Sequence, residues 1–114
     1  MKRLAVAAVG VVMVTFSAVT AFADPIVGNW KTGDGVLVGI SKCGTSFCVD
    51  VLDGEYAGKR SGKLKKDGKG YKGTLKQFST GISFSGSATI SGNTMNLAAK
   101  KFGVTVKRDK WRKQ

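Results

Sequence analysis

The stretch from Ile82 to Ile90 alternates between apolar and hydroxyl side chains, and it constrains the fold more than any other part of the chain. Ile82, Phe84, Ala88 and Ile90 share one parity, and Ser83, Ser85, Ser87 and Thr89 share the other. Successive side chains of a β-strand point to opposite faces, so this pattern predicts a half-buried strand with its apolar side inward. Turn residues follow at 91–94 and the alternation resumes at Met95 and Leu97, which predicts a hairpin.

Similar short apolar stretches recur along the chain and are separated by glycine-rich turns. Further strands are predicted around Trp30, from Val36 to Cys43, from Phe47 to Val51, near Leu64, from Tyr71 to Phe78, and last with Phe102, Val104 and Val106 on one face. No window after residue 23 has a sustained helical period. Seven or eight short antiparallel strands indicate an all-β fold, a small barrel or sandwich. Such a small barrel is filled by its own side chains, so a ligand would bind at a mouth or on a face.

The first 23 residues have the pattern of a secretory signal peptide. Lys2 and Arg3 precede an uncharged run from Leu4 to Ala23, which ends in the small-x-small sequence Ala21-Phe22-Ala23. A retained membrane anchor is the alternative, because about 20 apolar residues can just span a bilayer. We expect residues 1–23 to be cleaved, leaving residues 24–114 as a single periplasmic or secreted domain with no transmembrane span.

The predicted exported domain is strongly basic and contains no histidine. Lys2 and Arg3 are the only charges before Asp24, so 17 basic and 7 acidic residues remain, a formal charge of +10. Without histidine the commonest general base and metal ligand are missing, and we expect no enzyme, no cofactor and no metal site. Asp50, Asp53 and Glu55 are the one acidic cluster, where a solvated turn is favoured over a carboxylate-dependent hydrolase.

Cys43 and Cys48 predict a disulfide. Two thiols without histidine are too few for a zinc site. The oxidising compartment expected for an exported protein favours a disulfide between them. The bridge would clamp the turn between the strand that reaches Cys43 and the strand that begins near Phe47. A redox-active pair is the less favoured alternative, because four residues rather than two separate the cysteines and no helix signal follows.

The basic residues gather in two stretches. The first comprises Lys59, Arg60, Lys63, Lys65, Lys66, Lys69, Lys72 and Lys76, and the second Lys100, Lys101, Lys107, Arg108, Lys110, Arg112 and Lys113. We predict an anion-binding surface made of the whole first stretch with Lys107, Arg108, Lys110 and Arg112. A basic surface that serves solubility alone is the alternative. Tyr71, Phe78 and Trp111 could stack on a ligand beside these cations or belong to the core.

The predicted compartment determines which anionic partners a basic protein can meet. A pI of about 10.1 would suggest nucleic acid in a cytosolic protein, but export makes that partner unlikely. We therefore predict a non-enzymatic protein that binds an anionic envelope polymer or lipid, or a small amphipathic ligand. An interaction or inhibitor module acting on an acidic envelope protein is the alternative.

The stretch from Asp24 to Thr32, followed by Cys43-Gly44 and Phe47-Cys48, resembles the opening of small secreted bacterial proteins grouped as domain of unknown function 2147. Gly73, Phe84-Ser85-Gly86 and Trp111-Arg112 are similar to the second half of that family. The resemblance implies an exported, lipocalin-like small β-barrel with no established activity. It also implies structural roles for Gly28, Trp30, Cys43, Cys48 and Trp111. This chain lacks the second cysteine pair and the acidic, proline-containing turn that many relatives carry.

Overall fold

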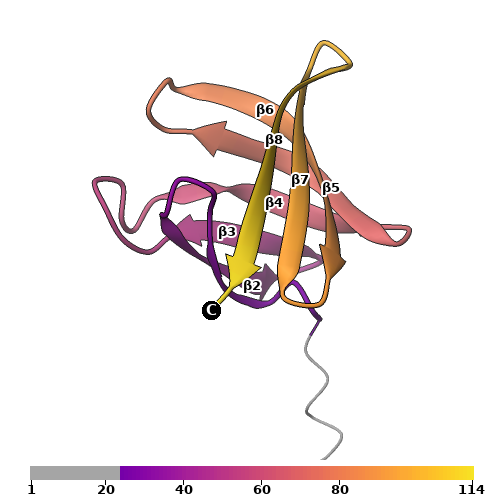
Figure 1. Ribbon diagram of the computed structural model, residues 1–114, viewed down its shortest axis with the longest axis horizontal. Coiled ribbons are helices and arrows are strands. Elements are labelled where there is room, and N and C mark those ends of the chain that lie inside the picture. Colours follow the sequence, from indigo (N-terminus) through magenta and orange to yellow (C-terminus); the bar gives the residue numbers. More distant parts are fainter. Residues whose placement is uncertain (1–23) are drawn as a thin grey trace, which may run out of the picture.

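The computed structural model describes residues 24–114, which form a closed antiparallel barrel (Figure 1). Its strands are β1 (Gly28–Lys31), β2 (Leu37–Cys43), β3 (Ser46–Val51), β4 (Arg60–Asp67), β5 (Gly70–Gln77), β6 (Ile82–Ser91), β7 (Thr94–Lys101) and β8 (Val104–Lys113). Each strand pairs with the next in sequence, and β8 closes the ring against β1. The predicted all-β fold of seven or eight short antiparallel strands is confirmed, and it is a small closed barrel of eight strands.

The predicted signal peptide, residues 1–23, lies outside the described residues. Within residues 24–114 no helix is long and apolar enough to cross a membrane.

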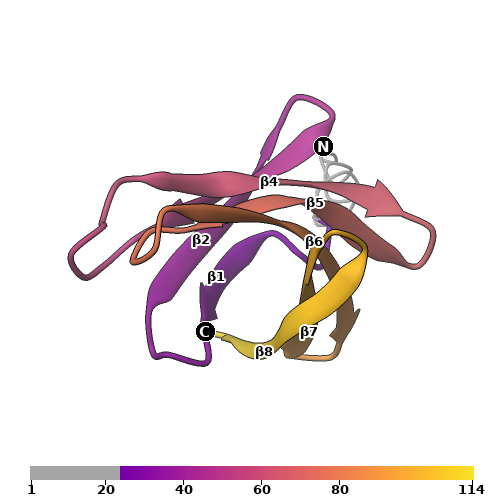
Figure 2. The ribbon, with the colours of Figure 1, turned by 90° about the horizontal axis from the view of Figure 1, so that it is seen from above.

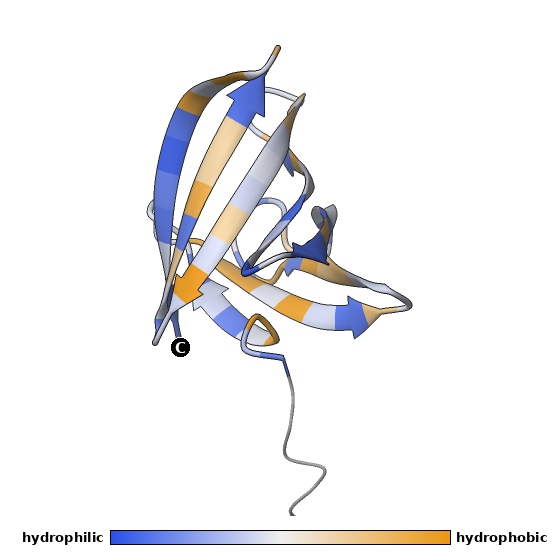
Figure 3. Ribbon diagram, turned by 90° about the vertical axis from the view of Figure 1, so that its right-hand side faces the viewer, coloured by the Kyte–Doolittle hydropathy of each residue, from blue (hydrophilic) through white to orange (hydrophobic). Residues whose placement is uncertain are grey.

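The core follows the alternation read from the sequence. Phe47, Val49 and Val51 are buried along β3, and the buried Val38 and Ile40 pair with Val51 and Val49 from β2. In Figure 3 apolar and polar bands alternate along the strands. Because one parity of each strand faces inward, the other parity supplies a polar outer wall.

The N-terminal end of the domain closes one end of the barrel with apolar side chains. Ile26 and Trp30 are fully buried, and the Trp30 Nε1–H donates a hydrogen bond of 2.9 Å to the Ile26 carbonyl. Burial of an indole is favourable only when its N–H finds such a partner. Trp30 and the buried Trp111 therefore both belong to the core.

The close approach of β4 and β5 depends on one glycine in each strand, Gly62 in β4 and Gly73 in β5. A Cβ at Gly62 would lie 1.9 Å from the Thr74 carbonyl oxygen, and one at Gly73 would lie 2.0 Å from the Lys63 carbonyl oxygen. Both contacts are far inside van der Waals distance, so no other residue fits without moving a strand. The cross-strand partner of Gly73 is Gly86, where a Cβ would meet the Leu75 side chain at 3.7 Å, an ordinary contact.

The disulfide joins the end of β2 to the middle of β3, as predicted. Cys43 and Cys48 have their Cα atoms 5.8 Å apart. Cys48 lies between Phe47 and Val49, which face the interior, so the bridge lies on the outer side of the β2–β3 hairpin.

The predicted apolar face of the last strand is wrong. Phe102 lies in the turn between β7 and β8 and is 95% exposed, while Val104 and Val106 are 62% and 53% exposed. The β7–β8 hairpin extends beyond the rest of the wall, because only Arg112 and Lys113 of β8 pair with β1. Its tip therefore has no opposite wall to pack against.

The apolar parity of β6 is also incomplete at the start of that strand. Ile82 is 43% exposed, although Phe84 and Ile90 are half-buried and Ala88 is buried. Ile82 is the first residue of β6, directly after the turn that joins β5 to β6.

Candidate anion-binding surface

The outer wall over β4 to β7 carries a hollow of about 510 Å³ that we call the outer trough. It is lined by Lys65, Asp67, Lys72, Gly73, Thr74, Ser85, Gly86, Ser87 and Lys100. Three cations and three hydroxyl groups thus surround a space that contains a single carboxylate. Lys65 and Lys72 come from the first basic stretch and Lys100 from the second, so the fold brings parts of the two stretches together.

The strand register explains how the trough is assembled. Lys65 is opposite Lys72, and Lys72 is opposite Ser87, which makes one row across β4, β5 and β6. Thr74, Ser85 and Lys100 form the adjacent row across β5, β6 and β7. Neighbouring strands are about 4.8 Å apart, so the two rows place ammonium and hydroxyl groups within the span of a few phosphate or carboxylate groups.

The cations of the trough are only partly neutralised. Lys72 Nζ lies 3.9 Å from Asp67 Oδ1, and both side chains are more than half exposed. Within the described residues, neither Lys65 nor Lys100 has a carboxylate oxygen within 4 Å. Such exposed ammonium groups remain hydrated at little energetic cost and are accessible to an anion.

A second, smaller hollow continues the outer wall toward β8. It is lined by Ser87, Ala88, Thr89, Asn96, Leu97, Ala98 and Arg108. Ser87 belongs to both hollows, and Ala98 lies between Ser87 and Arg108 in the register. Arg108 therefore adds a guanidinium to the edge of the polar wall, and a guanidinium can bind a phosphate or carboxylate through two N–H groups.

The other predicted surface cations are dispersed. Lys59 lies in the β3–β4 loop, Lys69 lies in the β4–β5 turn, and Lys110 and Arg112 are exposed on β8. Lys63 is exposed on β4 opposite Thr74, at the end of the second row of the trough but outside its lining. Arg60 is engaged by Asp50, with Nε 2.7 Å from Oδ1, and this ion pair raises the pKa of the guanidinium. Lys76 and Lys107 line the open end of the barrel.

Lys66 belongs to a separate polar cluster at the N-terminal end of the domain. Its Nζ lies 3.7 Å from Asp24 Oδ2 and 4.9 Å from the Tyr71 ring centroid. The Tyr71 hydroxyl donates to Asp24 Oδ1, and the Ile26 N–H donates to the same oxygen at 3.1 Å. Tyr71 is therefore a core residue with a structural hydrogen bond.

The titration of this cluster follows from its contacts. Partial burial raises the pKa of Asp24, but the hydrogen bonds from Tyr71 and Ile26 and the charge of Lys66 outweigh it, so its pKa lies below the usual 3.8. Burial, the hydrogen bond to Asp24 and the negative charge of Asp24 raise the pKa of Tyr71 well above 10.

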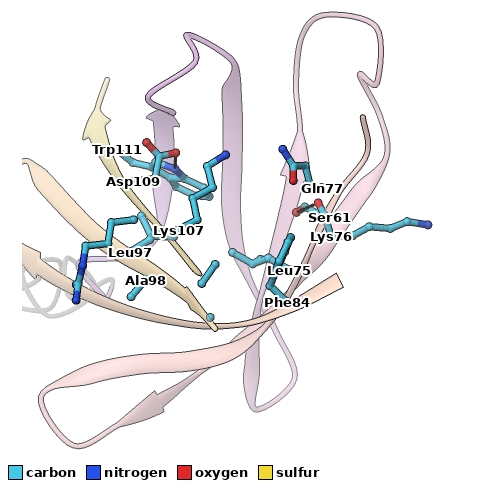
Figure 4. Close-up of a pocket in the computed structure, with 13 residues that line it drawn as sticks. Ser61, Leu75, Lys76, Gln77, Phe84, Leu97, Ala98, Lys107, Asp109 and Trp111 are labelled. Carbon is cyan, nitrogen blue, oxygen red and sulfur yellow. Dashed lines mark hydrogen bonds between the residues drawn. The ribbon is translucent and has the colours of Figure 1, made fainter. Parts of the chain in front are cut away.

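The open end of the barrel, where the β1–β2, β3–β4 and β5–β6 turns meet, carries a different kind of hollow that we call the barrel mouth. Its inner part, about 140 Å³, includes Leu75, Phe84, Leu97 and Trp111 among its lining residues. Figure 4 shows Leu75 and Phe84 on one side and Leu97 and Trp111 on the other. Its outer part, about 290 Å³, shares Lys107, Asp109 and Trp111 with the inner part.

The barrel mouth gathers acidic residues, in contrast to the outer trough. Asp34, Asp53, Glu55 and Asp109 line its outer part together with Lys76 and Lys107. Asp109 Oδ2 accepts the Trp111 Nε1–H at 2.9 Å, which orients the indole in the floor. Phe78, which also lines the mouth, is half-buried and stacks on Tyr56 with centroids 5.2 Å apart.

The predicted acidic cluster does not converge on one hollow. Asp50 binds Arg60, whereas the Asp53 Oδ1 accepts the Leu37 backbone N–H at 2.8 Å. Asp53 and Glu55 line the barrel mouth and Asp50 does not. In residues 24–114 no group of three or more carboxylate or cysteine side chains is arranged to hold a metal ion.

Sequence reasoning missed part of the trough. The sequence places Lys100 in a basic stretch but not in the predicted surface, predicts Ser85 and Ser87 only as the polar side of a strand, and gives no signal for Thr74. The signal that could have found them is the pairing of β5 with β6 and β7, which puts the hydroxyl row between two sets of lysines.

No family model, no curated protein and no solved structure matches this chain.

Proposed function

We propose that this protein binds an anionic component of the cell envelope through the outer trough, and that it acts as a binding protein rather than an enzyme. The observation that carries the proposal is the convergence of Lys65, Lys72 and Lys100 around three hydroxyl groups in one hollow. Repeated phosphate or carboxylate groups on a polymer or headgroup layer have the complementary charge. The expected location in the periplasm or outside the cell rests on the leader pattern and is supported by the disulfide.

The direct test measures binding of inorganic polyphosphate, a probe that has charge and no apolar part. Wild-type protein is titrated calorimetrically at low and high NaCl, and we expect affinity to fall steeply because salt screens exposed charges. The triple variant Lys65→Gln, Lys72→Gln, Lys100→Gln should bind about tenfold more weakly, since each exposed charge contact contributes on the order of 0.2–1 kcal/mol.

A matched control separates the trough from net charge. Lys31, Lys42 and Lys59 are exposed on β1, β2 and the β3–β4 loop, outside the trough. Their triple replacement by Gln removes the same three charges and should leave most of the affinity. Equal losses in the two triple variants would refute a localised site and favour the solubility interpretation.

A second candidate function is binding of a small amphipathic ligand in the barrel mouth. The supporting observation is an apolar floor formed by Phe84, Leu97 and Trp111 below a charged rim. An apolar part would displace water from the floor, and a polar head would remain at the rim.

This candidate is tested by filling the floor. Ala99→Leu places a larger side chain at a residue that lines the inner part of the mouth, while Ala57→Leu changes an exposed loop residue and is the control. Fluorescence of the apolar probe N-phenyl-1-naphthylamine should rise with wild type and Ala57→Leu and stay low with Ala99→Leu. A signal that is equal in all three proteins would place the probe elsewhere and reject the mouth as its site.

A further inference from the structure

We propose that the tip of the β7–β8 hairpin inserts into the interface of an anionic lipid bilayer, with Phe102 as its apolar anchor. This proposal deepens the proposed function, on which it rests, by naming a lipid surface as the anionic partner.

The turn at the tip has a residue type that is unfavourable for the conformation of its backbone. Phe102 and Gly103 both have positive φ angles, 54° and 79°, as in the two-residue turns that join twisted hairpins. Asn or Gly normally occupies the first of these positions, because a bulky side chain is strained in the left-handed region. Phe102 is the only residue other than glycine with a positive φ among residues 24–114.

The side chain of Phe102 buries almost no surface in the fold that would offset this strain. It is 95% exposed, and the neighbouring Val104 and Val106 are more than half exposed. Val106 also has no partner on β7, because the register passes from Lys107–Ala99 to Thr105–Lys100. A bulge of this kind twists a hairpin tip away from the wall that carries it.

Cations surround this apolar tip and acids are missing from it. Lys100, Lys101, Lys107 and Arg108 flank the three apolar residues, and no Asp or Glu occurs between Thr94 and Arg108. The Lys101 Nζ lies 5.9 Å from the Phe102 ring centroid. An aromatic ring with ammonium groups beside it matches the interface of an anionic bilayer, where the ring enters the acyl boundary and the cations meet the headgroups.

The charge of the tip favours a lipid surface over a second copy of this chain, since two such tips would repel each other. The tip is also continuous with the outer trough, because Lys100 of β7 lines the trough and precedes Lys101 directly. A hairpin seated in a bilayer would therefore bring the trough toward the headgroup phosphates.

The test uses vesicles of equal parts phosphatidylglycerol and phosphatidylcholine, with pure phosphatidylcholine vesicles as the charge control. Phe102→Asn keeps the turn, since Asn tolerates the left-handed conformation, and its thermal midpoint should equal or exceed that of wild type. Its binding to the anionic vesicles should be about tenfold weaker, because the buried area of one phenyl ring is lost. Leu52→Ser alters an exposed apolar residue of the β3–β4 loop and should bind like wild type.

A second variant reports the depth of the tip. Phe102→Trp adds an exposed indole to a chain whose own Trp30 and Trp111 are buried. Its additional emission should shift to the blue on anionic vesicles and be quenched by brominated acyl chains.

The outcomes separate this proposal from the preceding one. Equal vesicle binding by Phe102→Asn and wild type, or an unshifted Phe102→Trp emission, overturns the insertion of the tip; an acidic protein would then be the partner to examine. Binding of polyphosphate without binding of anionic vesicles overturns the lipid partner and leaves the trough intact. Loss of polyphosphate binding in both triple lysine variants alike refutes the trough while the vesicle result still stands.

Discussion

At the scale of single residues, the Tyr71–Asp24 hydrogen bond couples the stability of the domain to pH at both extremes. Asp24 has a pKa below 3.8 in the folded protein, so its stabilisation is present above that pH and is lost as the pH falls through the folded pKa. Tyr71 has a raised pKa, so its contribution is complete below about pH 10 and is lost as the pH rises further.

Tyr71→Phe should therefore lower the free energy of unfolding by about 1 kcal/mol near neutral pH, the usual net value of a hydrogen bond. The variant should also lose less stability than wild type on going from pH 9 to pH 11, because in wild type the Tyr71 phenol ionises in the unfolded chain while the fold keeps it protonated. Urea denaturation at a series of pH values measures both effects. Tyr56→Phe, in the β3–β4 loop, is the control and should retain the alkaline loss. A wild-type alkaline profile in Tyr71→Phe would contradict this assignment.

At the scale of the strands, close backbone packing requires glycine at one member of a cross-strand glycine pair and not at the other. Gly73→Ala should lower the free energy of unfolding by more than about 2 kcal/mol, because its Cβ would overlap the Lys63 carbonyl oxygen and separate β5 from β4. Gly86→Ala, at the directly opposite position on β6, should change it by no more than about 0.5 kcal/mol, since a Cβ there makes only ordinary van der Waals contacts. Chemical denaturation of the two variants side by side measures the difference. Similar stabilities for both would argue against the close approach of β4 and β5.

The sequence predicts strands well where a strand has one buried and one solvent-exposed face. The alternation around Val38, Val49 and Met95 identified β2, β3 and β7, because all three residues face a filled interior. It located β4 only through Leu64, since the remainder of that strand is charged residues with one serine and one glycine. It failed at Phe102 and Val104, because alternation indicates two faces without saying which one is buried.

The sequence predicts that the candidate site is basic, but it does not predict which residues line it. The composition predicts a basic surface, and the pattern of residues 1–23 predicts export. Which lysines share a hollow depends on pairing between strands that are distant in sequence, such as Thr74 with Ser85 and Ser85 with Lys100. Chain entropy and side-chain packing across the whole barrel set that register, and no local pattern encodes it.

At the scale of the whole molecule, charge is separated between two surfaces. Lysines dominate the outer trough over β4 to β7, and four carboxylates line the barrel mouth. An anionic surface therefore attracts the outer trough and repels the acidic rim of the barrel mouth. This difference orients the molecule on such a surface as well as holding it there.

The position of the domain start bears on the predicted leader. Ile26 is fully buried three residues after Ala23, and its carbonyl accepts the Trp30 indole N–H. We expect a secreting bacterial host to release a chain that begins at Asp24, and intact-mass spectrometry of the periplasmic fraction measures it. Leucine in place of both Ala21 and Ala23 should block processing and keep the chain at the membrane. Recovery of the full mass from Met1 in the wild-type chain would instead support the retained anchor.

The seam between β1 and β8 has a consequence for biogenesis. Seven of the eight strand pairings join sequence neighbours, and the ring closes where Trp30 pairs with Lys113 and Lys31 with Arg112, next to a hydrogen bond from the Gln114 N–H to the Asn29 carbonyl. During synthesis, which proceeds from the N-terminus, each hairpin can form in turn, but β1 keeps an unpaired edge until Arg112 and Lys113 have been made. Truncation before Arg112 would leave two open sheet edges, the form most prone to join other chains, so protection of the sheet from aggregation depends on the residues that pair with β1.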